Sequence, residues 1–252
     1  MVGLQKANFG KRIIAAIFDG ILLSIIAVGL AAVLSTAFGY DGYINTVQSV
    51  RDEYQKEYNV DFAISAEKYS ELTEAERENF LKADEAFRKD QRVVYAYNML
   101  ISLTMLITTI PLLIAFVVIE FLVPKLLGNG QTLGKKIFGI ALMHTEGIEI
   151  TGVQLFARAV LGKFAIELMI PLSMIFMILT QMIGVVGIAV LLAILVAQII
   201  CLVSSKTNSL IHDVMSATVA VDMASQRIFK DREALLNYTK RIAAEKAAKA
   251  DY

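Results

Sequence analysis

The chain has 252 residues, 56% of them hydrophobic, and a mean hydropathy of +0.60. This composition is too apolar for an ordinary soluble domain and indicates a membrane protein. Lys and Arg equal Asp and Glu at 24 each, so the net charge of zero predicts no nucleic-acid partner. The single cysteine, Cys201, excludes an intramolecular disulfide and suggests no cysteine-based metal site.

Four stretches are apolar and long enough to cross a membrane as helices. A hydrocarbon core of about 30 Å requires roughly 20 helical residues. The first stretch is also too long for the apolar region of a cleaved signal peptide. The third contains Lys163, Glu167 and Pro171, so it either spans the membrane or lies along its surface. The four stretches are residues 13–38, 93–123, 157–180 and 183–203.

The charges beside these stretches predict their orientation, because basic residues concentrate in cytoplasmic loops. The N-terminal segment has three basic residues and no acidic one, and residues 224–252 have seven basic and four acidic residues. Residues 39–92 instead have 13 acidic and 8 basic residues. We therefore expect a multi-pass protein of the cell membrane with both termini in the cytoplasm and residues 39–92 outside.

The acidic insert, residues 39–92, is predicted to be helical. Thr73 and Glu76 match a capping box directly before a helical pattern. We expect the insert to form a helical hairpin or an outward extension of the second span. It would act as a solvated cap or as a site for a ligand or partner. One apolar stripe, with Tyr69 nearby, would comprise Leu72, Phe80, Leu81 and Phe87.

Three short β-like runs flank the last two spans: residues 140–144, 148–151 and 217–221. Residues 145–147, between the first two runs, are typical of a hairpin turn. Together the runs could form a small cytoplasmic sheet.

Each span contributes a polar side chain to the half of the membrane nearer the cytoplasm. A charged residue at the bilayer centre costs about 2.5–3.5 kcal/mol on insertion scales, so such residues face the protein interior. Lys163 and Glu167 are four residues apart and share one helix face. Arg12 lies almost two helical turns before Asp19. The polar layer comprises Asp19, Glu120, Lys163, Glu167 and Gln198.

This layer has a functional and a structural interpretation. In the first, Asp19 and Glu167 bind a proton or a small cation such as Na⁺ in turn, and Arg12 and Lys163 tune them. Burial favours the protonated form of a carboxylate, whereas a nearby cation favours the ionised form, so a balanced group can exchange H⁺ for Na⁺. In the second interpretation, Arg12 neutralises Asp19, Lys163 neutralises Glu167, and both pairs fix the helices.

Asp213 follows the fourth span and is expected at the depth of Arg12. An ion pair with Arg12 that closes the bundle is one role, and a titrating pair with His212 is the alternative. The two histidines, His144 and His212, and the nearby acids lack the spacing of metal ligands, so we expect no metal site.

After the second span, residues 130–136 read GQTLGKK, and Gly139 follows. This motif, together with the arginine and two aspartates, resembles the RDD family of bacterial membrane proteins. The family is defined by one arginine and two aspartates, which match Arg12, Asp19 and Asp213. The resemblance implies sodium–proton antiport or an accessory or regulatory role, both of which have been proposed for members. Its cytoplasmic motif, whose lysines we expect to contact anionic lipid, comprises Gly134, Lys135, Lys136 and Gly139.

The basic tail is helical by composition. Ile228, Leu235 and Ile242 recur every seven residues, which is typical of an amphipathic surface helix or a short coiled-coil seam. The tail would be a solvated helix or a contact for a dimer or partner.

We therefore expect an all-α polytopic membrane protein with four transmembrane helices, a small cytoplasmic β-like element and a helical extracytoplasmic insert. Its segments are residues 1–38, with the first span, the insert at 39–92, the remaining spans and cytoplasmic loop at 93–222, and the tail at 223–252. The resemblance covers about residues 8–38 and 94–222.

Two functions fit these expectations. One is small-cation and proton exchange through the buried carboxylate layer, and the other is a non-transporting scaffold or regulator of another membrane protein. The chain has neither a GxSxG nor an HExxH motif, so we expect neither an enzyme nor a cofactor. The expected partners are the lipid bilayer, Na⁺ or H⁺, and another membrane protein or a second copy.

Overall fold

The computed structural model describes residues 4–205 and 207–250. The first three residues of the predicted N-terminal segment and the last two of the predicted tail lie outside this part. Within the described residues, four helical segments are long and apolar enough to cross a membrane, and they confirm the all-α polytopic fold. The third is continuous over 28 residues, which is enough to span. The four are Phe9–Ala37, Gln91–Leu127, Gly152–Leu179 and Val185–Ser204.

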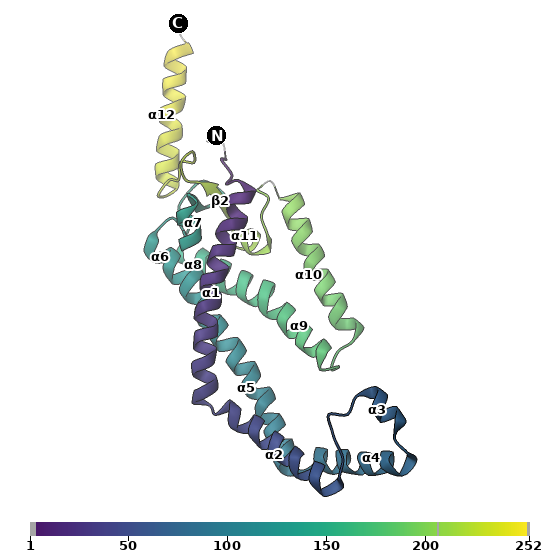
Figure 1. Ribbon diagram of the computed structural model, residues 1–252. Coiled ribbons are helices and arrows are strands. Elements are labelled where there is room, and N and C mark those ends of the chain that lie inside the picture. The colour runs from purple at the N-terminus through teal and green to yellow at the C-terminus, as the bar shows by residue number, and fades with distance from the viewer. Residues whose placement is uncertain (1–3, 206, 251–252) are drawn as a thin grey trace. The chain divides into compact units, whose positions relative to one another are not determined.

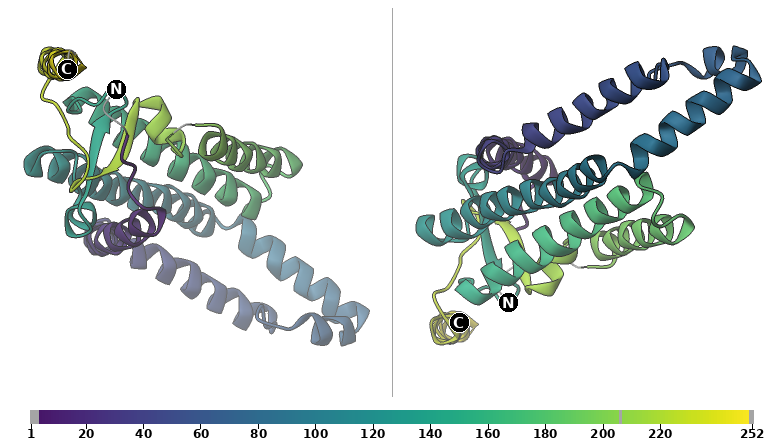
Figure 2. Two further views of the ribbon diagram at one scale, coloured as in Figure 1. Left: turned by 90° about the horizontal axis from the view of Figure 1, so that it is seen from above. Right: turned by 90° about the horizontal axis from the view of Figure 1, so that it is seen from below.

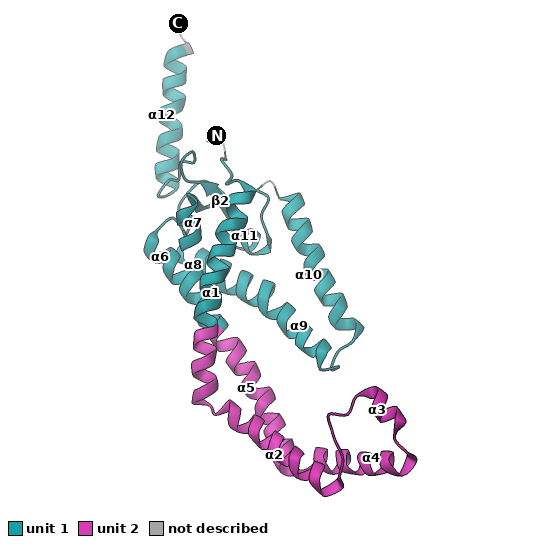
Figure 3. Ribbon diagram, in the orientation of Figure 1, with its two compact units in different colours: residues 1–27, 112–252 teal, residues 28–111 magenta. Residues whose placement is uncertain are grey.

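The chain forms two compact units (Figure 3). Unit 2 comprises Val28–Pro111, and unit 1 comprises the described residues on either side of it. Helices α1 (Phe9–Ala37) and α5 (Gln91–Phe116) pass from one unit into the other. Unit 2 therefore contains the predicted insert together with the ends of both spans that flank it.

Unit 1 is built from the larger share of the helices and the only sheet of the described chain. The N-terminal end of α1, the sheet, α7 and α11 gather at one end of this unit (Figure 1). Its further elements are η1 (Val117–Leu122), α6 (Val123–Leu127), α7 (Leu133–Ile137), β1 (Ile140–His144), α8 (Gly152–Phe156), η2 (Ala157–Met169), α9 (Ile170–Leu179), α10 (Val185–Ser204), α11 (Ile211–Met215), β2 (Thr218–Asp222) and α12 (Arg232–Ala250).

The second and third spans each contain a π-helical segment, η1 and η2, in which hydrogen bonds run between residues five apart. The N–H of Val123 donates to the carbonyl of Val118, and that of Ile170 donates to the carbonyl of Ala165. Each segment is followed by a proline in the first turn of the next α-helix. Proline has no N–H to donate, which favours a change of helical bonding at these points.

The sheet consists of β1 and β2 in antiparallel register, with Ile140 opposite Asp222 and His144 opposite Thr218 (Figure 2). Both faces are buried, since alternate residues of the strands pack into two separate apolar clusters. Lys6 adds an isolated antiparallel bridge to Val221, so the start of the chain also pairs with β2.

The predicted β-like run at residues 148–151 does not form a strand, and only Ile148 makes an isolated parallel bridge, to Phe229. The N–H of His144 donates to the carbonyl of Ile148, 2.9 Å away, and closes a turn instead of continuing a ladder. Thr151 and Gln154 then form the capping box of α8, which stabilises a helix in the residues that follow. The predicted run at 217–221 forms as β2, shifted by one residue because Ala217 is left-handed (φ 52°).

Unit 2 is a helical assembly of α2 (Tyr40–Tyr58), α3 (Ala66–Glu71), α4 (Glu74–Lys89) and the adjoining parts of α1 and α5. The predicted capping box at Thr73 and Glu76 is confirmed. Leu81 is 56% exposed and so does not belong to the predicted apolar stripe. The core of the unit comprises Val47, Val50, Phe87, Val93 and Ala96.

The tail helix α12 begins at Arg232, so Ile228 lies before the helix and not on the predicted heptad seam. Ile228 packs instead against the cluster beneath β1 and β2. The rings of Phe229 and Tyr238 are 5.1 Å apart, and the guanidinium of Arg227 lies 4.5 Å above Tyr238. These contacts attach the start of α12 to the sheet.

Candidate functional site

Asp19 is buried within the first span and binds the N-terminal end of α7. Its carboxylate accepts hydrogen bonds from the hydroxyl of Thr132 and from the backbone N–H of Gly134, 2.7 Å away. The N–H groups of a first helical turn have no partner within the helix, so a carboxylate there satisfies them. The predicted pair of Arg12 with Asp19 is therefore wrong, because the carboxylate of Asp19 binds the N-terminal end of α7 instead.

Gly134 makes this contact possible. A Cβ at this position would lie 2.4 Å from the carbonyl oxygen of Ala15 and 2.9 Å from Oδ1 of Asp19. Only glycine lets the backbone of α7 approach α1 closely enough for the hydrogen bond. The glycine of the GQTLGKK motif thus has a packing role.

Asp213, at the start of α11, joins two arginines. Nε of Arg158 donates to Oδ1 at 2.7 Å, and Nη2 of Arg12 lies 3.6 Å from Oδ2. Arg12 also donates to the backbone carbonyl of Asn208, 3.0 Å away. Burial alone would raise the pKa of Asp213, but the charge and hydrogen bond of Arg158 hold it well below its usual range. Both partners that the sequence analysis considered for Asp213 therefore lie beside it, since Nε2 of His212 is also 3.6 Å from Oδ2.

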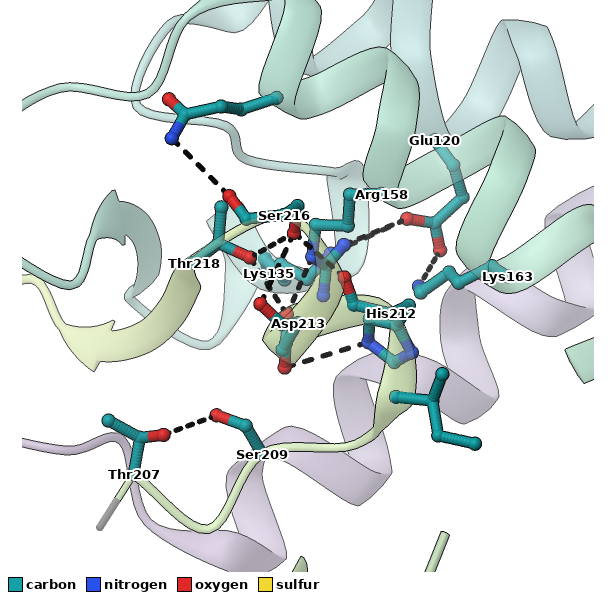
Figure 4. A network of polar contacts seen from close by, with 12 residues as sticks. Glu120, Lys135, Arg158, Lys163, Thr207, Ser209, His212, Asp213, Ser216 and Thr218 are labelled. Carbon is teal, nitrogen blue, oxygen red and sulfur yellow. Dashed lines mark hydrogen bonds and ion pairs between the residues drawn. The ribbon is translucent and has the colours of Figure 1, made fainter. Parts of the chain in front are cut away.

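Arg158 is the residue that the sequence analysis missed. It is only 3% exposed and bridges Asp213 and Glu120. Its Nη1 lies 3.6 Å from Oε2 of Glu120 (Figure 4). It is the second residue of the predicted third span, 157–180, where a basic side chain is typical of the cytoplasmic end of a membrane helix. Its spacing of five residues from Lys163 would have indicated a shared face had the π-helix been expected.

Glu120 is surrounded by three cations. The ammonium of Lys163 donates to Oε1, whereas Nζ of Lys135 lies 3.6 Å from Oε2. Arg158 and Lys163 both reach this carboxylate because η2 aligns residues five apart. The predicted pair of Lys163 with Glu167 is therefore wrong.

Lys135 does not contact lipid as predicted. It is 9% exposed, and burial lowers its pKa from 10.5 to about 7, against the opposing charge of Glu120. Its neighbour Lys136 is exposed. Gly139 has φ 65° and accepts a hydrogen bond from the N–H of Met223, so it connects the motif to the segment after β2.

Glu167 pairs with His212. Nδ1 of the ring lies 2.9 and 2.8 Å from the two carboxylate oxygens, and the backbone N–H of His212 donates to Oε1 at 3.0 Å. Burial lowers the pKa of the ring below its usual 6.5, against the opposing charge of Asp213. Gly162 allows this approach, because a Cβ there would lie 2.6 Å from Cβ of His212.

Gln198 lies beside this pair, and its side chain contacts the carboxylate of Glu167. Oε1 of Gln198 accepts from the N–H of Ile211 at 3.2 Å and so ties α10 to α11. It does not line the pocket described next.

The ionisable side chains meet in one pocket of about 530 Å³. Four acidic side chains and four lysine or arginine side chains line it, so the two kinds are equal in number. His212 adds a ring that can also gain a proton. Several facing atoms, such as Oε2 of Glu120 and Nη1 of Arg158, are buried without a hydrogen-bond partner among the residues that the structure describes. The charged lining residues are Arg12, Asp19, Glu120, Lys135, Arg158, Lys163, Glu167 and Asp213.

Four membrane-spanning helices with a charged interior pocket define a polytopic membrane protein with a polar core. The RDD family model matches residues 6–217, which is most of the chain, and the protein belongs to the RDD family. The arginine and two aspartates of the resemblance, Arg12, Asp19 and Asp213, all line the pocket. No curated protein and no solved structure matches the chain.

Proposed function

We propose that this RDD family protein exchanges protons for small cations across the cell membrane, with both termini in the cytoplasm. In this proposal, Glu167 and His212 carry the proton. The observation that carries it is the direct contact of a carboxylate and an imidazole, 2.8 Å apart, on the wall of a pocket between membrane-spanning segments. Ionisable residues inside membrane spans commonly mark ion and proton pathways.

Glu167 differs from the other carboxylates of the pocket. Asp19 is held by two hydrogen bonds to α7, and Glu120 and Asp213 both face Arg158. The nearest charged partner of Glu167 is a histidine, a type of side chain that gains and loses a proton in the physiological pH range, and burial shifts His212 toward its neutral form. Asp19, considered a carrier from the sequence, is therefore assigned a positioning role.

The charge of the pair explains how exchange would work. With a neutral ring and an ionised carboxylate, the pair carries one negative charge and attracts a cation. One added proton cancels that charge and removes the attraction. Proton and cation thus compete for the same pair, which is the requirement for exchange. The proposal assigns no enzymatic reaction.

The test is cation-driven proton movement in proteoliposomes. Glu167→Gln and His212→Asn should each lower the flux at least tenfold with folding intact. Glu146→Gln removes an exposed partner of Arg232 and should leave the flux unchanged. Undiminished flux in both pocket variants would refute the role of the pair, and no flux in the wild type for Na⁺, K⁺ or Li⁺ would refute exchange.

A specific observation favours a second candidate, a non-transporting scaffold or regulator of another membrane protein. Each acid of the pocket already has a donor or cation within 3.6 Å, as a purely structural network would. In that case Glu167→Gln would lower thermal stability, and neither the wild type nor the variant would transport cations.

A further inference from the structure

Unit 2 contains a second pocket, of about 670 Å³, lined by residues of α2, α4, the first turns of α5 and Phe62 in the segment between α2 and α3. Three phenylalanines form one part of its wall. The ring of Phe62 lies 5.7 Å from that of Phe80 and 5.5 Å from that of Phe87. Val93 and Val94 complete the apolar lining.

Arg51 supplies a positive charge to this pocket. Within the described part of the chain, its side chain has no ion pair or hydrogen bond, and its Nε is buried without a partner. Its guanidinium lies 5.9 Å from the ring centre of Phe87, a distance at which a cation is attracted to an aromatic face. The other arginine of the pocket, Arg88, is already paired with Asp84 at 2.7 Å. The pocket therefore has an unpaired cation against an apolar wall.

The pocket lies at the beginning of a membrane span. The second span starts at Gln91, and pocket residues Val94 and Tyr97 belong to its first two turns. Ile101 and Met105 continue from them on the same helix face, since the spacings are three and four residues. These four side chains are between 39% and 51% exposed, so an apolar stripe runs from the pocket along the span. Tyrosines are typical of the interface between membrane and water.

We propose that this pocket binds the headgroup of a membrane phospholipid. The phosphate diester pairs with Arg51, and the acyl chains lie along the stripe formed by Val94, Tyr97, Ile101 and Met105. A guanidinium can donate two parallel hydrogen bonds to a phosphate, which makes arginine a preferred partner of this group. Asn98, which also lines the pocket, provides a further donor. A soluble phosphate would gain the charge pair but not the contact along the stripe.

The test uses the full-length protein purified in detergent and incubated with phosphatidylglycerol or phosphatidylethanolamine, with bound lipid counted by native mass spectrometry. Wild type should retain one phospholipid that Arg51→Gln retains about tenfold more weakly. Arg51→Lys should recover part of the binding. Inorganic phosphate added without lipid should not bind. Added to the lipid-bound protein at equal concentration, it should not displace the lipid.

Arg77→Gln is the matched control. Arg77 also lies 5.9 Å from an aromatic ring, and its Nε is also buried without a partner in the described part of the chain, but Arg77 is outside the pocket. It should leave lipid retention unchanged. If Arg51→Gln fails to fold, Val94→Glu places a carboxylate at an exposed pocket position and should expel the lipid. Equal retention in wild type and the folded Arg51 variant, or in Val94→Glu, would overturn the proposal, as would equal binding of inorganic phosphate.

Discussion

The carboxylate of Asp19 accepts a hydrogen bond from the backbone N–H of Gly134 at 2.7 Å, and this contact joins residues 115 positions apart in the chain. Two of the sequence features that resemble the RDD family thereby meet at one point: the first aspartate and the glycine–lysine motif. Their shared role is to fix α7 against the first span. This places the adjacent Lys135 within the pocket, beside Glu120.

Gly134→Ala should destabilise the protein by about 1–3 kcal/mol, the usual range for adding a methylene to a packed interior. The new Cβ would meet the carbonyl of Ala15 at 2.4 Å, and a backbone atom cannot rotate away. Gly42→Ala is the control, because a Cβ there meets nothing within 4 Å and alanine favours the helix. Thermal unfolding in detergent measures both. Equal stability of Gly134→Ala and wild type would contradict the proposed close packing.

Arg158→Met should cost about 3–5 kcal/mol, because removing one partner of a buried ion pair leaves an uncompensated charge. Here two acids, Glu120 and Asp213, lose their shared cation. The exposed Arg232, which pairs with Glu146 on the surface, gives the comparison: Arg232→Met should leave the unfolding temperature nearly unchanged. Similar melting of the two variants would mean that the interior network does not support the fold.

Lys135 should make the protein more stable as pH rises from about 7 to 10.5. Burial lowers the pKa of this lysine to about 7 in the folded protein, against 10.5 for an ordinary lysine. Between these values the unfolded chain binds more protons than the folded protein, so the free energy of unfolding increases with pH. Lys135→Met should flatten this part of the stability profile. Lys136→Met, at the exposed neighbouring position, should not, and the idea fails if both variants keep the wild-type slope.

The two sides of the membrane can be assigned by cysteine labelling. In a Cys201→Ser background, Ala75→Cys lies on the exposed surface of the insert and Ser225→Cys on the exposed segment after β2. A membrane-impermeant maleimide should label the first in intact cells and the second only after lysis. The reverse pattern would place the termini outside.

The sequence predicts the spans well because about 20 apolar residues in a row have few alternatives to a membrane helix. The capping box of α4 was equally accessible, since its two residues are three positions apart. The partners of the buried charges were not. Asp19 binds Thr132 and Lys163 binds Glu120, and these contacts depend on tertiary packing that no local pattern records.

Two local conformations explain most of the remaining differences. The π-helical bonding of η2 turned Arg158 and Lys163 towards the same carboxylate, although an α-helical reading paired Lys163 with Glu167. The N-cap of α8 at Thr151 starts a helix where a third strand was expected. In both places the sequence allowed two backbone structures, and packing selected one.

The position of β2 and Asp213 in the chain has a consequence for biosynthesis. Both are synthesised after all four spans, yet β2 pairs with β1 and Asp213 receives Arg158 and Arg12. Until the ribosome has passed this region, two arginines near or within the bilayer lack their shared carboxylate. The part of the polar core around Asp213 is thus assembled last, and a nascent chain interrupted before Asp213 would expose this mismatch to the proteases that remove unfinished membrane proteins.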